Sequence, residues 1–202
     1  MKSRKAGNRH TILLYKRVMD RMWTATLLLG ILLLGLWSWG WFSPAVLIEA
    51  QNSFWLLAGS GMLLGFTLFA FFGRNMAYVQ ARPNHLRLVT PFLRTNISYK
   101  RMRSVHPANF QLLYPPSEAS WAERRLLEPF YGKTAVVIDL NDYPLPPFFL
   151  RFFLAPQMFS KSNKGLVLLV PDWMAFSTEI DTFRARQTTT RRQQSQVPGW
   201  LR

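Results

Sequence analysis

The sequence contains no cysteine and few acidic residues. Only ten Asp and Glu stand against 25 Lys and Arg among 202 residues, and there are three His. Without cysteine no disulfide framework can form, which fits a cytoplasmic domain. His10, His85 and His106 share no metal-ligand spacing, so the sequence predicts no metal site. Because no glycine-rich phosphate loop and no Gly-x-Ser-x-Gly elbow occur, we expect no cofactor, no catalytic residue and no enzyme.

Charge is also missing from two long stretches near the N-terminus. The runs Met22–Ile48 and Ala50–Gly73 are separated by a single charge, Glu49. A helix needs about 20 apolar residues to cross a bilayer core, and each run is long enough to hold one. We therefore expect a transmembrane helical hairpin over 22–73. The long basic leader argues against a cleaved signal peptide. The expected spans are about 22–42 and 54–72.

Positive charge is concentrated on the two flanks of this hairpin. Residues 1–21 hold seven Lys or Arg and one Asp, and residues 73–103 hold seven and no acid. Flanks rich in Lys and Arg stay on the cytoplasmic side of a membrane. The sequence thus predicts a multi-pass protein of the cell (inner or plasma) membrane. Its N-terminus and C-terminal part would be cytoplasmic, and the connection 43–53 would lie on the far side.

The two expected spans lack every ionisable residue type, which a transport pathway or proton relay usually requires. They are therefore interpreted as an anchor. Gly61 and Gly65 form a small-xxx-small spacing that lets helix backbones approach closely. Two interpretations are open: packing against the first helix of the same hairpin, or a contact between two copies. The short connection favours the first, so a homo-oligomer is possible but not indicated.

After Gly73 the pattern changes to short alternating segments bounded by Pro, Asn and Gly, which is typical of antiparallel strands. A capping box formed by Ser120 and Glu123 predicts a short helix over Ser120–Leu127. The expected strands are Met76–Arg82, His85–Thr90, Leu93–Ile97, Val105–Leu113, Thr134–Leu140 and Gly165–Val170.

The last predicted element is an amphipathic helix that Asp172 can cap. Its apolar residues recur at spacings of three and four, which places them on one face. Beyond residue 187 the sequence is too polar to bury itself, so we expect a disordered basic tail over 187–202. The apolar stripe consists of Trp173, Phe176, Ile180 and Phe183.

The segment from Tyr78 to Val105 resembles the opening of PH-like (pleckstrin-homology-like) domains in bacterial membrane proteins, where two transmembrane helices precede the domain. The resemblance implies a mainly β cytoplasmic domain over 74–186, folded as a PH-like barrel of bent antiparallel sheet and capped by the C-terminal helix. Segments 111–133 and 143–164 depart from it and are expected to be enlarged loops. The matching residues are Leu86, Leu88, Thr90, Pro91, Phe92, Ile97, Ser98, Tyr99, Met102 and Val105.

A basic cluster lies within the matching region and has two interpretations. It can bind anionic lipid, since each Lys or Arg near an acidic leaflet contributes about 1 kcal/mol. The second interpretation, which we favour, is that these charges serve only to set the membrane topology and to keep the domain soluble. Nucleic acid is not expected as a partner, because the chain is tethered and carries no recognition motif. The cluster consists of Arg94, Lys100, Arg101 and Arg103.

The segment Pro144–Phe159 contains an apolar run, Phe148–Leu154, whose only charge is Arg151. The run is too short to span a membrane and too apolar for an ordinary exposed loop. Burial against the barrel mouth or the capping helix, entry into the membrane interface, and binding of a protein partner are all open. The residues concerned are Phe148, Phe149, Phe152 and Phe153.

Together these patterns predict a membrane-anchored, non-catalytic binding or scaffold module. Its domain would contact membrane lipids and an unidentified protein partner. The alternative is a small accessory subunit of a membrane transport or secretion complex.

Overall fold

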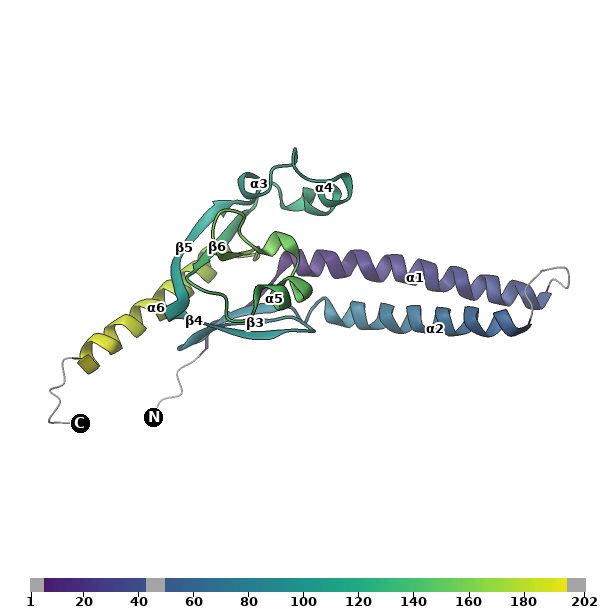
Figure 1. The fold of residues 1–202 in the computed structure, drawn as a ribbon, viewed down its shortest axis with the longest axis horizontal. Coiled ribbons are helices and arrows are strands. Elements are labelled where there is room, and N and C mark those ends of the chain that lie inside the picture. Colours follow the sequence, from purple (N-terminus) through teal and green to yellow (C-terminus); the bar gives the residue numbers. More distant parts are fainter. Residues whose placement is uncertain (1–5, 43–49, 196–202) are drawn as a thin grey trace. The chain divides into compact units, whose positions relative to one another are not determined.

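The structure is a computed structural model that describes residues 6–42 and 50–195 (Figure 1). The chain divides into two compact units. The hairpin unit is Tyr15–Met76, and the sheet unit joins the N-terminal segment up to Leu14 to the chain from Ala77 onward. The predicted connection and tail fall partly outside the description, at 43–49 and 196–202.

The hairpin contains two helices, α1 (Leu13–Phe42) and α2 (Ala50–Gly73). Both are long and apolar enough to span a membrane, over Leu13–Gly40 and Phe54–Gly73, as the uncharged runs predict. α1 begins well before the predicted span, because its first turns are the amphipathic and basic residues that precede Met22.

Two side-chain hydrogen bonds join the two sides of the hairpin unit. The Thr67 hydroxyl donates to Thr26 Oγ1 at 2.9 Å. Near the start of α1 and the end of α2, Arg74 Nη1 donates to Asp20 Oδ1 at 3.3 Å. Most large apolar residues point outward instead, among them Leu28, Ile31, Leu68 and Phe72.

The sheet unit contains two antiparallel sheets. Sheet A has the order β1–β2–β3–β4, and sheet B has the order β5–β6–β7. No strand pairing joins the two sheets within the described ranges, so the predicted closed barrel is not confirmed. The strands of the two sheets are β1 (Arg9–Thr11), β2 (Tyr78–Ala81), β3 (His85–Val89), β4 (Arg94–Ser98), β5 (Met102–Asn109), β6 (Thr134–Leu140) and β7 (Gly165–Leu168).

Strand β1 is the largest departure from the sequence-based prediction. It lies within residues 1–21, which were expected to form a separate leader, and it pairs with β2 at the edge of sheet A. The hairpin is therefore inserted into the sheet unit: the chain leaves sheet A after β1 and returns to it at β2.

Short helices fill the two predicted enlarged loops. The capping box of α4 is present: the Ser120 hydroxyl accepts from the Glu123 amide, and the Glu123 carboxylate accepts from the Ser120 amide. The elements in these loops are α3 (Phe110–Leu113), α4 (Trp121–Leu127) and α5 (Pro147–Phe153), with the 3-10 turns η2 (Glu128–Phe130) and η3 (Pro156–Met158). A further 3-10 turn, η1 (Tyr99–Arg101), lies between β4 and β5.

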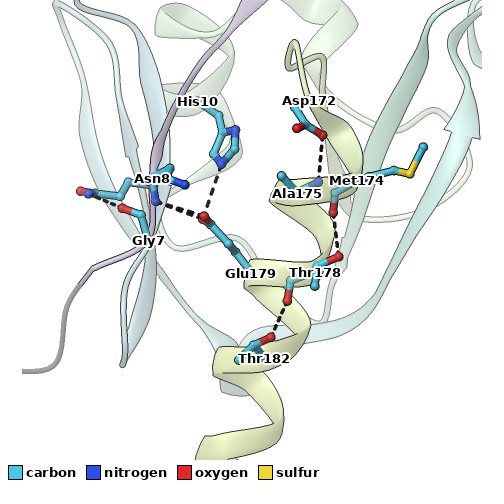
Figure 2. A network of polar contacts seen from close by, with 10 residues as sticks. Gly7, Asn8, His10, Asp172, Met174, Ala175, Thr178, Glu179 and Thr182 are labelled. Carbon is cyan, nitrogen blue, oxygen red and sulfur yellow. Dashed lines mark hydrogen bonds and ion pairs between the residues drawn. The ribbon is translucent and has the colours of Figure 1, made fainter.

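The final helix, α6 (Trp173–Ser195), covers the core of the sheet unit. The amide of Ala175 donates to Asp172 Oδ1 at 2.9 Å, which is the predicted cap (Figure 2). Phe176 and Ile180 are fully buried, so the centre of the predicted stripe is confirmed. α6 continues to Ser195, so residues 187–195 are helical where a disordered tail was expected. The apolar core comes from both sheets and includes Val79, Leu86, Leu88, Ile97, Val136, Ile138, Leu166 and Leu168.

Candidate functional site

The predicted basic cluster does not form one patch. Arg94 is the first residue of β4, and Lys100 and Arg101 lie in η1, just beyond its last residue. Four strand steps, about 13 Å, separate the two ends of β4. Arg101 Nη1 donates to the carbonyl of Tyr143 at 3.1 Å, which holds it at the far end. Arg103 is the second residue of β5, directly after η1, so it lies at the same end of β4 as Lys100 and Arg101.

Of the four residues in the predicted cluster, Arg94 alone lies at the end of sheet A that is connected to the hairpin. Thr11, the last residue of β1, pairs with Tyr78, and Tyr78 pairs with Val89. Arg94 in turn pairs with Val89. These residues mark the end where the chain passes into α1 and comes back from α2.

Gly61 and Gly65 do not pack within the hairpin. A Cβ added at either would meet no atom within 4 Å among the described residues. Gly30 instead makes the close approach, since its added Cβ would lie 3.2 Å from Leu64. The favoured interpretation, in which Gly61 and Gly65 pack against the first helix, is therefore not what the structure shows.

The Phe-rich run forms α5 and is mostly exposed. Phe148 is 82% exposed, Phe152 78% and Phe149 52%, whereas Leu150 and Leu154 are buried beneath them. Phe153 is half-buried, and its ring centroid lies 5.0 Å from that of Phe152. We call Phe148, Phe149 and Phe152 the α5 patch. Burial of these three rings, one of the open interpretations, does not occur in the described structure.

Arg151 stands beside the α5 patch and also lines a pocket of about 580 Å³. Helical geometry places Phe148 and Phe152 on one face of α5, with Arg151 on its flank and Leu150 opposite. Among the residues that the structure describes, none forms a hydrogen bond or ion pair with Arg151. The guanidinium is thus available to an external anion.

The other charged groups that line this pocket are already paired. Lys161 Nζ lies 2.7 Å from Glu118 Oε2, and Gln157 Nε2 donates to Glu123 Oε1 at 3.3 Å. Burial raises the pKa of Tyr114 to about 12, and its hydroxyl donates to the carbonyl of Phe159. The apolar part of the lining includes Pro115, Leu127 and Phe159. Sequence reasoning missed this pocket because its residues come from two segments that were read as loops.

A polar cluster crosses sheet B but lacks the order of a nucleophilic triad. The Ser104 hydroxyl donates to Asp139 Oδ2, and His106 Nδ1 lies 3.7 Å from the same oxygen. The carboxylate therefore stands between serine and imidazole. In a Ser–His–Asp triad the imidazole stands between the other two and takes the serine proton.

The N-terminal segment is fastened to α6 by Glu179 (Figure 2). The amide of Asn8 donates to both carboxylate oxygens of Glu179 at 3.2 Å, and His10 Nε2 lies 3.5 Å from Oε2. The His10 ring is buried and lies 5.1 Å from the ring of Phe176. We call these contacts the N-terminal clasp. It is structural, because it secures β1 against the helix that covers the core.

Protein-family models, curated proteins and solved structures were compared with the chain, and none of the three comparisons found a match.

Proposed function

We propose that the chain is a membrane-anchored, non-catalytic binding module. In this proposal the hairpin crosses the cell membrane, and the sheet unit lies at the cytoplasmic leaflet, where it contacts a protein partner and lipid.

The observation that carries the proposal is the insertion of the hairpin between β1 and β2. Thr11 and Tyr78 pair in neighbouring strands, and only Ile12 separates Thr11 from the start of α1. If α1 and α2 cross a membrane as a hairpin, both flanks must lie on one side, as this pairing requires. The cytoplasmic side follows from the basic flanks.

This insertion also keeps the sheet unit close to the bilayer. Nine helical steps, about 13 Å, separate Leu13 from Met22, where the uncharged run begins. Four residues link Gly73 to Tyr78, and the five steps between them reach at most about 18 Å. Neither flank is a long flexible linker, so the module samples partners at the membrane surface and not deep in the cytoplasm.

The PH-like architecture remains part of the proposal. Two antiparallel sheets and a C-terminal helix with Phe176 and Ile180 buried support a capped, bent sheet of the kind that the resemblance implies. Contacts with proteins, and with lipid through Arg94 at the hairpin-connected end of sheet A, are the expected uses of such a module.

Single-cysteine labelling tests the topology, since the chain has no native cysteine. Asn163→Cys places a thiol on an exposed loop of the sheet unit, and Ser43→Cys places one in the connection. An impermeant maleimide added to intact cells is expected to label Ser43→Cys only, and Asn163→Cys only after permeabilisation. Labelling of both variants from outside would overturn the proposed membrane arrangement.

A hairpin exchange separates the module from the alternative accessory subunit. Residues 15–76 are replaced by an unrelated two-helix anchor, and in-membrane crosslinking is followed by mass spectrometry. A module keeps its partners, because its contacts are in the sheet unit. A subunit that assembles through its spans loses them. The accessory-subunit alternative is supported by Gly61 and Gly65, because an added Cβ at either would meet no atom within 4 Å among the described residues, which leaves this helix face open to another helix.

A further inference from the structure

The α5 patch consists of exposed aromatic rings, and Arg151 beside it has no hydrogen-bond or ion-pair partner among the described residues. Most other apolar side chains of the sheet unit are buried, and isolated exposed ones occur elsewhere, such as Leu112 and Trp121. Within the described part of the sheet unit, α5 is the one helix on which three exposed Phe adjoin one another. Apolar residues on one face with a basic residue at the flank are typical of helices that lie in a membrane interface.

We infer that α5 is a second membrane contact of the sheet unit, in which Phe148 and Phe152 enter the interfacial layer and Arg151 pairs with a lipid phosphate. This inference rests on the proposed function, because it takes the bilayer crossed by the hairpin as the surface that α5 meets.

The position of α5 in the sheet unit favours the bilayer as its occupant. Phe159 pairs with Leu166 of β7 in antiparallel fashion, so the residues before Phe159 run alongside those after Leu166. Beyond β7, the carbonyl of Leu169 accepts a hydrogen bond from the amide of Leu13 at 2.9 Å. Followed backward from Phe159 toward α5, the chain therefore runs toward Leu168, the last residue of β7. This is the end of β7 that lies next to Leu13, the first residue of α1.

The length of the chain places this end within reach of the interface. About 13 Å of helix separates Leu13 from the uncharged run of α1. The headgroup region adds roughly 5 to 7 Å on each side of the hydrocarbon core. Roughly 6 to 8 Å therefore remain between Leu13 and the headgroup region, a distance comparable to the length of a large side chain.

The rings and the guanidinium would contribute in different ways. Burial of each ring is expected to shift the contact equilibrium on the order of tenfold. Arg151 presents a planar fork of donors that matches a phosphate group. The adjoining pocket leaves room for the headgroup that carries the phosphate. Its other charged side chains already have partners within the sheet unit: Lys161 pairs with Glu118, and Glu123 accepts a hydrogen bond from Gln157.

Depth-dependent quenching tests the inference on the full-length chain. Phe148→Cys and Phe152→Cys are each labelled with a small fluorophore and reconstituted in vesicles of phosphatidylethanolamine and phosphatidylglycerol. Some of the lipids carry a nitroxide close to the headgroup. Both probes are expected to be quenched strongly. Asn163→Cys is the matched control: it lies just before Gly165, at the opposite end of β7, and is expected to stay unquenched.

The role of Arg151 is tested in the Phe152→Cys background. Arg151→Gln is expected to lower the equilibrium constant of the membrane contact, read from the quenching, about fivefold. Arg151→Lys keeps the charge and is expected to retain most of the quenching. Because both positions are exposed, the fold should survive these changes, and unfolding of each variant by urea checks that it does.

Equal quenching of Phe148→Cys and Asn163→Cys would overturn the inference, as would unquenched Phe probes that crosslink to a protein partner. Either result leaves the proposed function intact if the thiol labelling pattern of Ser43→Cys and Asn163→Cys holds. A failed labelling pattern instead refutes the membrane arrangement itself, so the two failures are distinguishable.

Discussion

The hairpin unit and the sheet unit place apolar and polar side chains in opposite ways. In the hairpin, Leu and Phe side chains point outward and the buried groups include Ser60 and Thr67. In the sheet unit, apolar residues from both sheets and α6 fill the interior. The same residue type therefore has a different meaning in each unit. An exposed Phe is ordinary on α2, but on α5 it is an exception that needs an explanation.

The largest expected effect is on the stability of the sheet unit, where a buried Phe and an exposed Phe can be compared. Phe176 is fully buried beneath the sheets, so Phe176→Ala should lower the free energy of unfolding by about 3 to 5 kcal/mol. Phe148→Ala is the matched control. At 82% exposure it should change stability by less than about 0.5 kcal/mol. Pulse proteolysis of the full-length protein in urea measures both.

A similar cost for the two substitutions would contradict the exposed placement of α5. It would mean that Phe148 is packed in the native state, and the comparison between an apolar interior and an exceptional surface patch would fail.

Local signals in the sequence predicted the elements that local chemistry determines. The uncharged runs predicted the two helices, Ser120 with Glu123 predicted the start of α4, and Asp172 predicted the start of α6. The hairpin helices were predicted from unbroken apolar stretches. The starts of α4 and α6 were predicted from residues three positions apart that form a cap.

Contacts between distant residues could not be predicted in this way. β1 is a three-residue strand whose partner begins at Tyr78, far along the chain, and its short polar sequence shows no alternation. α5 was missed as a helix because its consecutive Phe residues show no helical period. The pocket and the N-terminal clasp also join distant segments, so their residues carried no shared signal.

A smaller effect tests how tightly the N-terminal segment is held. A Cβ at Gly7 would lie 3.0 Å from the carbonyl oxygen of Ala81 and would collide with the carboxylate of Glu179. Glu179 cannot move away freely, because it accepts hydrogen bonds from the Asn8 amide. Gly7→Ala should therefore cost about 1 to 3 kcal/mol and increase hydrogen exchange at Asn8.

Gly61→Ala provides the comparison in the other unit. Its added Cβ meets nothing within 4 Å, and alanine favours a helix, so the hairpin should be unaffected or slightly more stable. Loss of hairpin stability in Gly61→Ala that matches the loss in Gly7→Ala would show that Gly61 is packed, and the contrast between the two glycines would be wrong.

The smallest expected effect is the pH dependence of α4, at the edge of the pocket. Hydrogen bonds from the Ser120 amide and hydroxyl lower the pKa of Glu123 below its usual value of 4.5. A carboxyl group with a lowered pKa in the folded state stabilises that state fully above its unfolded pKa. This contribution is lost as the pH falls from about 4.5 through the folded value. Glu123 is exposed, so the loss should be only a few tenths of a kcal/mol.

Hydrogen-exchange protection of the α4 amides, corrected for intrinsic rates, measures this loss between pH 5.5 and roughly pH 3. Glu123→Gln is the matched variant, because glutamine also accepts at this position of a capping box but does not titrate. Protection should fall with pH in the native chain and stay flat in the variant. A parallel fall in both would assign the change to another group. In that case, the capping box would hold the edge of the pocket independently of the charge on Glu123.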